Sequence, residues 1–236
     1  MQKLLSLVRA AAEKYNMIED GDKIAVCVSG GKDSVALLKC LIELRRFYPK
    51  HFEVCAITVD PCFYGKEGDY SAIEKLCSEN GVTYTVKRTD LYNVIFEIRQ
   101  EKNPCSLCAR MRRGLLHDTA KELGCNKIAL GHHIDDAAET FLMNLFSGGR
   151  AECFSPVSYL SRKDLYMIRP LIFAYESDII RVVRKENLPV VKSNCPVDEK
   201  THREETKMLL SELEKKYPAL RQKIIGAMQT GNISGW

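Results

Sequence analysis

Three groups of residues in this sequence have types and spacing suited to chemistry, and the first is the run Ser29-Gly30-Gly31-Lys32-Asp33-Ser34. Its glycines allow the backbone to approach a ligand closely and to adopt positive φ angles. Its hydroxyls, its lysine and the N–H groups of a following helix can bind phosphate oxygens. The aspartate suits such a loop if Mg²⁺ bridges Asp33 to the phosphates. An isolated Gly-Gly pair would indicate only a tight turn, but the complete run predicts a phosphate-binding loop.

The second group is Gly131-His132-His133-Ile134-Asp135-Asp136, which also follows an apolar run. Gly131 permits close approach to a nucleotide. The two carboxylates suit the positive end of a following helix, which is the ordinary role for acids at this position. Two adjacent histidines after a glycine are not a usual zinc-ligand spacing, so we do not expect zinc here.

The third group is made of cysteines. Cys105 and Cys108 form the only C-x-x-C motif of the chain, and Cys195 supplies a third thiolate far along the sequence. A C-x-x-C motif alone fits zinc, thiol–disulfide exchange or an iron–sulfur centre. A four-cysteine zinc site would need a second pair, whereas three thiolates can hold a [4Fe-4S] cluster and leave one iron without a protein ligand. The rival chemistry needs no cluster: Cys105 or Cys108 carries a persulfide that resolves through Cys195.

Arginines adjoin the cysteine motif. Arg110, Arg112 and Arg113 follow it on one predicted helix, and planar guanidinium groups suit phosphate recognition. A solvated basic face is the alternative for this helix. We single out Arg112 as a residue that holds the reacting base or a phosphate, and we expect Arg169 to point into the same cleft.

The elements that must position these groups alternate along the chain. Apolar runs predict strands, and each is followed by a segment with helical periodicity. This alternation is typical of an α/β fold with a parallel sheet covered by helices on both faces, whose ligands bind beyond the carboxyl ends of the strands. Strands are expected at 23–28, 52–59, 83–87 and 127–130, and helices at 2–15, 34–44, 71–80, 109–123, 135–146 and, in a charged tail, 200–228.

We divide the chain into a domain over 1–192, which includes the N-terminal helix, and a C-terminal helical segment over 193–236. Residues 230–236 look frayed. The 236 residues are 45% hydrophobic and 28% charged, with a net charge of +4 and ten cysteines. No signal peptide or membrane span is visible, so we expect a cytoplasmic protein whose cysteines serve metal binding or catalysis.

The run at residues 29–34 resembles the PP-loop of the ATP pyrophosphatases, Rossmann-like α/β enzymes that cleave ATP between its α and β phosphates. From about residue 17 to about residue 228 the chain further resembles the tRNA 2-thiocytidine synthetase family. The matching segments are residues 16–22, Cys105-Ser106-Leu107-Cys108, Arg112-Arg113-Gly114, Gly131-His132-His133, Asp135-Asp136 and Ile168-Arg169-Pro170-Leu171.

The resemblance implies an ATP site that includes Gly131 and His132, a [4Fe-4S] cluster, and an acidic residue in metal binding or proton transfer. For that acid we favour Asp136 over Asp135. Asp60 is either a residue facing the adenosine or an ordinary turn aspartate. The chain departs from many family members, which carry a second cysteine pair where it has Ser193-Asn194-Cys195, so the alignment of Cys195 is slightly open.

The implied reaction adenylates the C2 carbonyl of a tRNA pyrimidine and replaces oxygen by sulfur, and cytidine is favoured. The related 2-thiouridine synthetases usually carry terminal zinc-binding cysteine pairs, which this chain lacks. The alternatives are a 2-thiouridine synthetase, an adenylating ligase or amidase without a cluster, and a nucleotide-sensing module. The expected partners are tRNA and a sulfur donor, either sulfide or a desulfurase persulfide. A second copy of the chain, in a homodimer, is a further candidate partner.

Overall fold

The computed structural model describes residues 1–100, 104–192, 194–195 and 202–236. Its centre is a six-stranded sheet with the order β3-β2-β1-β4-β6-β5. All neighbouring strands pair in parallel except the edge hairpin of β5 and β6. The strands are β1 (Asp22–Cys27), β2 (Phe52–Asp60), β3 (Thr83–Arg88), β4 (Lys127–Ala129), β5 (Val157–Leu160) and β6 (Leu165–Ile168).

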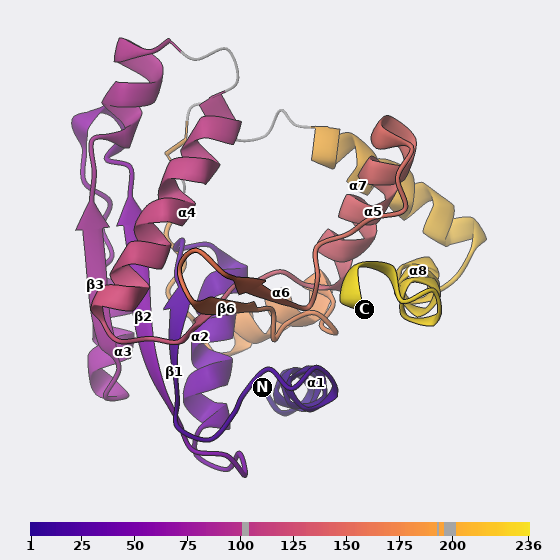
Figure 1. The fold of residues 1–236 in the computed structure, drawn as a ribbon, viewed down its shortest axis with the longest axis horizontal. Helices are drawn as coiled ribbons and strands as arrows, with labels where there is room; N and C mark the ends of the chain where they lie inside the picture. Colours follow the sequence, from indigo (N-terminus) through magenta and orange to yellow (C-terminus); the bar gives the residue numbers. More distant parts are fainter. Residues whose placement is uncertain (101–103, 193, 196–201) are drawn as a thin grey trace.

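Helices cover both faces of this sheet (Figure 1), as the alternating sequence pattern predicts. One face of β1 and β2 packs with α1, α2, α3 and α6, and the other packs with α4. The α-helices are α1 (Gln2–Lys14), α2 (Lys32–Leu44), α3 (Ser71–Glu79), α4 (Pro104–Glu122), α5 (Ile134–Gly148), α6 (Glu176–Lys185), α7 (His202–Lys216) and α8 (Leu220–Thr230).

Alternation along β1 explains the two layers. Ile24 and Val26 are buried in the core shared with α2, whereas Ala25 is buried in the core beneath α4. Successive side chains of a strand point to opposite faces of its sheet, so a strand covered on both faces is apolar throughout. This is why the run before the glycine loop reads as a continuous apolar segment.

The chain reverses its direction across the sheet between β1 and β4. From β1 it builds outward through β2 and β3, and it then returns to pair β4 with the other side of β1. Ligand sites of open α/β sheets lie at such a switch point, beyond the carboxyl ends of the strands. The loop after β1 and the turn after β4 both open at this place.

The C-terminal part differs from the expectation in two ways. The charged tail forms two helices rather than one, because the chain turns after α7 at Pro218 and at Ala219, whose φ is +58°. The end of the chain is packed rather than frayed: Trp236 is 6% exposed, and its indole N–H donates to the Phe154 carbonyl at 2.9 Å. The terminal ring also contacts the ring of Tyr15, which follows α1.

The helices α7 and α8 pack on α5 (Figure 1). The expected division after residue 192 stays a prediction, and residue 193 lies outside the described residues. No helix in the described ranges combines the length and hydropathy needed to cross a bilayer.

A buried ion pair ties the amino ends of β1 and β4 together. Lys127 Nζ lies 2.7 Å from Asp22 Oδ2, and the two side chains are 8% and 4% exposed. Lys127 also donates to the Met17 carbonyl at 3.1 Å, and Asp22 accepts a hydrogen bond from Asn126 at 2.7 Å. Removal of one partner from a buried pair leaves an uncompensated charge in the core.

We therefore expect Lys127→Met to lower the free energy of unfolding by about 3–5 kcal/mol. The matched control is Lys87→Met, which breaks an exposed pair with Glu122 and should cost about 0–1 kcal/mol. Urea denaturation of both variants measures the difference. Equal losses in the two variants would contradict the structural role given to the buried pair.

Candidate active site

The glycine loop joins β1 to α2 and has a backbone that a side chain would disrupt. Gly30 has a φ of +89°, and a Cβ added there would lie 2.9 Å from the Cβ of Val191. The Val191 N–H donates to the Gly30 carbonyl at 2.9 Å. The loop is therefore held against the segment that leads to Cys195, and Gly30 is needed both for its conformation and for this close approach.

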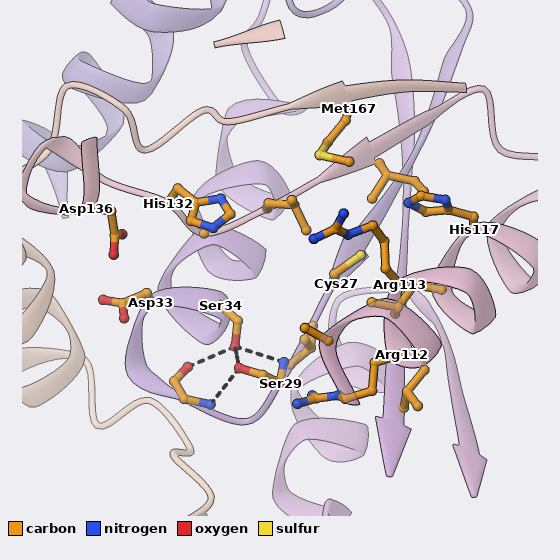
Figure 2. A pocket seen from close by; sticks show the side chains of 18 of the residues that line it. Cys27, Ser29, Asp33, Ser34, Arg112, Arg113, His117, His132, Asp136 and Met167 are labelled. Carbon is orange, nitrogen blue, oxygen red and sulfur yellow. Dashed lines mark hydrogen bonds between the residues drawn. The ribbon is translucent and has the colours of Figure 1, made fainter. Parts of the chain in front are cut away.

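Hydrogen bonds between the two serines fix the shape of the loop (Figure 2). The Ser29 N–H donates to Ser34 Oγ at 3.1 Å, and Ser34 Oγ donates to the Gly31 carbonyl at 2.9 Å. The Gly31 N–H in turn points at Ser29 Oγ, 3.3 Å away. The loop is thus organised by its own side chains before any ligand binds.

The turn after β4 packs directly on the glycine loop. A Cβ added at Gly131 would lie 3.1 Å from the Asp33 carbonyl carbon and 3.2 Å from the Ser34 nitrogen. Only glycine lets the two backbones approach this closely. The two motifs that the sequence singled out therefore form one continuous surface.

His132 lies on this surface as a neutral imidazole. Its ring packs at 4.9 Å from the ring of Phe154, and its Nδ1 is buried without a hydrogen-bond partner in the described part of the chain. Burial lowers the pKa of His132 to about 4, although the Asp136 charge acts in the opposite direction. A neutral ring with an unsatisfied polar atom in a cavity wall is suited to a hydrogen bond with a ligand.

Two carboxylates, Asp33 and Asp136, flank the second histidine. His133 Nε2 lies 3.8 Å from Asp33 Oδ1 and 3.4 Å from Asp136 Oδ2. Burial alone would lower the pKa of His133, but its contact with Asp135 and the charges of Asp136 and Asp33 raise it above its ordinary value. Figure 2 shows that the two flanking carboxylates lie on the same side of the cavity.

These two carboxylates fit Mg²⁺, which prefers oxygen ligands. Asp33 Oδ1 is buried and has no hydrogen-bond partner among the described residues, so one of its lone pairs is available to a cation. Asp135 has a different role: it pairs with Arg221 of α8 at 2.7 Å and accepts the Glu176 N–H at 2.8 Å. Asp136 lines the first cavity but also caps α5, because its Oδ2 accepts the His133 N–H at 3.0 Å, so the choice of Asp136 over Asp135 stays a prediction.

The lysine of the loop is held by an acid that the sequence did not reveal. Lys32 Nζ lies 2.9 Å from Glu176 Oε1 and 3.0 Å from Asp33 Oδ2. Glu176 begins α6, and its other oxygen lies 3.0 Å from Lys207 Nζ of α7. Lys32 is thus kept beside the loop by a chain of ion pairs that reaches the C-terminal helices.

Two cavities open on either side of the loop, with volumes of about 460 and 510 Å³. Both are lined by Ser29, Gly31 and Arg112, so the loop and one arginine separate them. The first also contains Asp33, Ser34, Arg113, His117, Gly131, His132, Asp136 and Arg203, among others. The second also contains Asp60, Phe63, Lys66, Tyr70, Val191, Lys192 and Asn194, among others.

Asp60 lines the second cavity and has a structural role in the loop after β2. Its carboxylate is 3% exposed and accepts the N–H groups of Cys62 at 3.0 Å and Gly68 at 2.7 Å, which shapes the loop after β2. These bonds fit the turn-aspartate alternative, and the adenosine contact stays a prediction. Arg169 is not among the residues of either cavity, because its guanidinium bonds to the Ser155 carbonyl and lies over the Phe154 ring.

The cysteines of the C-x-x-C motif lie in the first two turns of α4, which begins earlier than the predicted residue 109. Cys105 is exposed, and Cys108 is partly buried. Burial raises the pKa of the Cys108 thiol, Arg112 acts in the opposite direction, and Cys195 and Cys105 raise it further. Cys195 is therefore near enough to Cys108 to act on it electrostatically.

These three cysteines have the donor chemistry of an iron–sulfur site, and their gathering around one cluster stays a prediction. Within the described ranges, no three His, Cys, Asp or Glu side chains are gathered closely enough to hold one metal ion. A cluster binds each cysteine through a different iron, so its ligands are spread more widely. The two thiols of α4 and the thiol of Cys195, with the cation Arg112 one turn after Cys108, are the thiolates that a cluster would need.

Two residues of the first cavity were missed by sequence reasoning. His117, on α4, is buried, and its pKa is lowered by burial and by the charges of Arg113 and Lys163. Arg203 lies in the charged tail that we interpreted as an appended helical segment. No local pattern distinguishes either residue from a surface residue of an amphipathic helix.

Comparisons with known proteins show the family of this chain. A PP-loop domain family matches residues 4–210. The tRNA-cytidine(32) 2-sulfurtransferase of Geobacter sulfurreducens is 40% identical over 235 residues, which cover 98% of this chain and 90% of that protein. The protein of the same name from Acinetobacter baumannii is 38% identical over 236 residues, covering 99% and 77%.

Solved structures share the fold. The U34-tRNA thiolase NcsA from Methanococcus maripaludis, with its [4Fe-4S] cluster, has a TM-score of 0.77 and 25% identity, over 96% of this chain and 78% of that one. The NH3-dependent NAD synthetase of Campylobacter jejuni, at 17% identity, has a TM-score of 0.51 over 100% and 96% of the two chains, and this likeness concerns the fold alone. The chain belongs to the PP-loop family and, within it, to the tRNA-cytidine(32) 2-sulfurtransferases.

Proposed function

We propose that this protein uses ATP to adenylate the C2 carbonyl of a cytidine in tRNA and then replaces the oxygen by sulfur. One observation carries the proposal: Arg112 lines both cavities beside the glycine loop and lies one helical turn after Cys108. Arg112 thus lies beside the phosphate-binding loop and one turn from Cys108, although none of the three cysteines is among the residues that line the two cavities. The names of the relatives support cytidine 32 as the target.

The first step takes place at the loop. The phosphates of ATP lie on residues 29–34, and Asp33 and Asp136 would hold Mg²⁺, which would supply positive charge to neutralise the phosphates. The C2 carbonyl oxygen of the base attacks the α phosphate, the bond between the α and β phosphates breaks, and pyrophosphate leaves with the electron pair. The loop contributes alignment and charge neutralisation, because its donors are already in place before the reaction.

The second step needs a sulfur nucleophile near the activated base. Cys105, Cys108 and Cys195 would hold the [4Fe-4S] cluster, which supplies an iron without a protein ligand on which sulfur from sulfide or a persulfide can be presented. Arg112 keeps the base and its phosphate oriented between the two cavities. Attack of sulfide on C2 forms the C–S bond and breaks the C–O bond, so that AMP leaves with the original C2 oxygen and the electron pair. A persulfide donor would also need an external thiol as a two-electron reductant, because its S–S bond must be cleaved.

A uridine is the second candidate substrate, because the structural likeness to a U34-tRNA thiolase is extensive. Deleting the gene and measuring tRNA nucleosides by mass spectrometry distinguishes the candidates. We expect loss of 2-thiocytidine, its return with the wild-type gene, and unchanged 2-thiouridine. Loss of 2-thiouridine alone would assign the uridine reaction, and unchanged thiolation would refute sulfur transfer to tRNA.

A further inference from the structure

Two basic residues of α7, one helical turn apart, reach the acids around the glycine loop. Arg203 Nη1 lies 2.9 Å from Asp136 Oδ1, and its Nη2 lies 3.3 Å from Thr140 Oγ1. Lys207 Nζ lies 3.0 Å from Glu176 Oε2, while the other oxygen of Glu176 holds Lys32. The helix α7 thus contacts the second motif directly and reaches the loop lysine through Glu176.

Arg203 differs from its neighbour because it is part of the cavity wall. It lines the first cavity together with Ser29, Asp33 and Asp136, and 42% of its side-chain surface is exposed. A guanidinium has five N–H donors, and these two contacts leave others available to a ligand. An arginine needed only to fasten α7 to α5 would not require this exposure toward the cavity.

The partner of Arg203 is a carboxylate that we assign to Mg²⁺. When Asp136 binds a cation, its attraction for the guanidinium falls, and Arg203 becomes available to the polyphosphate that enters with the metal. The leaving pyrophosphate gains negative charge as the bond between the α and β phosphates breaks. A planar guanidinium can bind two phosphate oxygens at once, which favours this exchange of partners.

We propose that Arg203 binds the pyrophosphate portion of ATP and stabilises its charge during adenylation. The inference rests on the proposed function, because it takes ATP as the ligand of the first cavity. Lys207 is a positioning residue: it orients Glu176, which holds Lys32 beside the loop. The helix α7 then contributes a ligand-binding side chain to the ATP site.

Calorimetric titration with inorganic pyrophosphate, in Mg²⁺ and separately in EDTA, tests the proposal on the full chain. We expect Arg203→Ala to weaken binding by about 10- to 100-fold in Mg²⁺, since a charge-assisted bidentate contact is lost, and by a smaller factor in EDTA, where Asp136 keeps the guanidinium engaged. Arg203→Lys should fall between this variant and the wild type. The control, Lys215→Ala, removes an exposed cation from the far end of α7 and should bind as the wild type does.

A second pair of variants removes the contribution of Asp136. Asp136→Asn leaves Arg203 without its carboxylate partner, so in EDTA we expect pyrophosphate to bind at least as tightly as to the wild type. The double variant Asp136→Asn/Arg203→Ala should bind about 10-fold or more weakly than Asp136→Asn alone. This comparison measures the direct contact, because the ion pair is absent from both proteins.

Several results would overturn the inference. Binding by Arg203→Ala in Mg²⁺ within twofold of the wild type would do so. Equal binding in EDTA by Asp136→Asn and by the double variant would also do so, because it would mean that Arg203 acts only through Asp136. If the wild type binds pyrophosphate and ATP, such a result refutes the role of Arg203 alone. If the wild type binds neither, the proposed function fails as well.

Discussion

Cys108→Ser is expected to abolish thiolation of tRNA while leaving the affinity for ATP within about twofold of the wild type. The variant replaces a thiol by a hydroxyl, which does not ionise near neutral pH and binds cluster iron more weakly than a thiolate does. Cys108 lies on α4 and contributes nothing to the glycine loop, which is held by its own serines. This variant should therefore retain ATP binding and lose sulfur transfer.

The matched control is Cys62→Ser. Cys62 is also partly buried, follows β2, and is not among the residues of either cavity. It should retain thiolation and ATP binding. Thiolated nucleosides are measured by mass spectrometry after reaction with unmodified tRNA under anaerobic conditions, and ATP binding by titration of a non-hydrolysable analogue.

Iron analysis of the same proteins decides between the two sulfur chemistries. If a cluster is bound, wild-type protein reconstituted anaerobically is brown and contains about four irons per chain, whereas Cys108→Ser, Cys105→Ser and Cys195→Ser each lose most of this iron. If the cysteines carry a persulfide instead, the wild type is colourless and active. Activity that survives in Cys108→Ser would refute the cluster scheme, and activity that survives in Cys195→Ser would refute the persulfide scheme as well, because both of its forms resolve through Cys195.

The sheet and the loops at its carboxyl edge could be predicted from the sequence because their signals are local. Strands buried on both faces are apolar throughout, and the glycines mark where the backbone must approach another segment. The edge hairpin of β5 and β6 was not predicted. Its strands are four residues long, and outward-facing Tyr159 and Tyr166 are 53% and 44% exposed, so they lack that continuous apolar pattern.

The electrostatic part of the site could not be predicted, because ion pairs between distant segments leave no periodic signature. Glu176 begins a helix that carries no motif, yet it holds Lys32 of the loop. Arg203 lies in a charged tail that looks like a solvated helix, yet it lines the cavity. Asp135 and Asp136 are adjacent and alike in sequence, and only the packing of α8 directs one toward Arg221 and leaves the other in the cavity.

Asp33→Asn is expected to reduce pyrophosphate release by about 10²- to 10³-fold, the cost of removing one preorganised group that neutralises transition-state charge. The asparagine keeps the shape of the side chain but not its charge, so Mg²⁺ binds more weakly and activity should rise as Mg²⁺ is increased. Asp118→Asn is the control, because its carboxylate is exposed on α4 and pairs only with Lys163 among the described residues. Release of pyrophosphate from ATP in the presence of tRNA is the measurement.

A double-mutant cycle with Asp136→Asn tests whether the two carboxylates share one cation. Both lie within 4 Å of the same His133 nitrogen, and the cycle tests the proposal that they share one Mg²⁺. If they hold one ion, the first substitution already removes most of its effect, and the double variant should be little worse than the more damaging single one. Free energies that add in full would mean that the carboxylates act independently. Substitutions of residues that act as one unit have strongly non-additive effects, so the cycle measures the shared site directly. Because the measurement is pyrophosphate release, it does not depend on sulfur transfer.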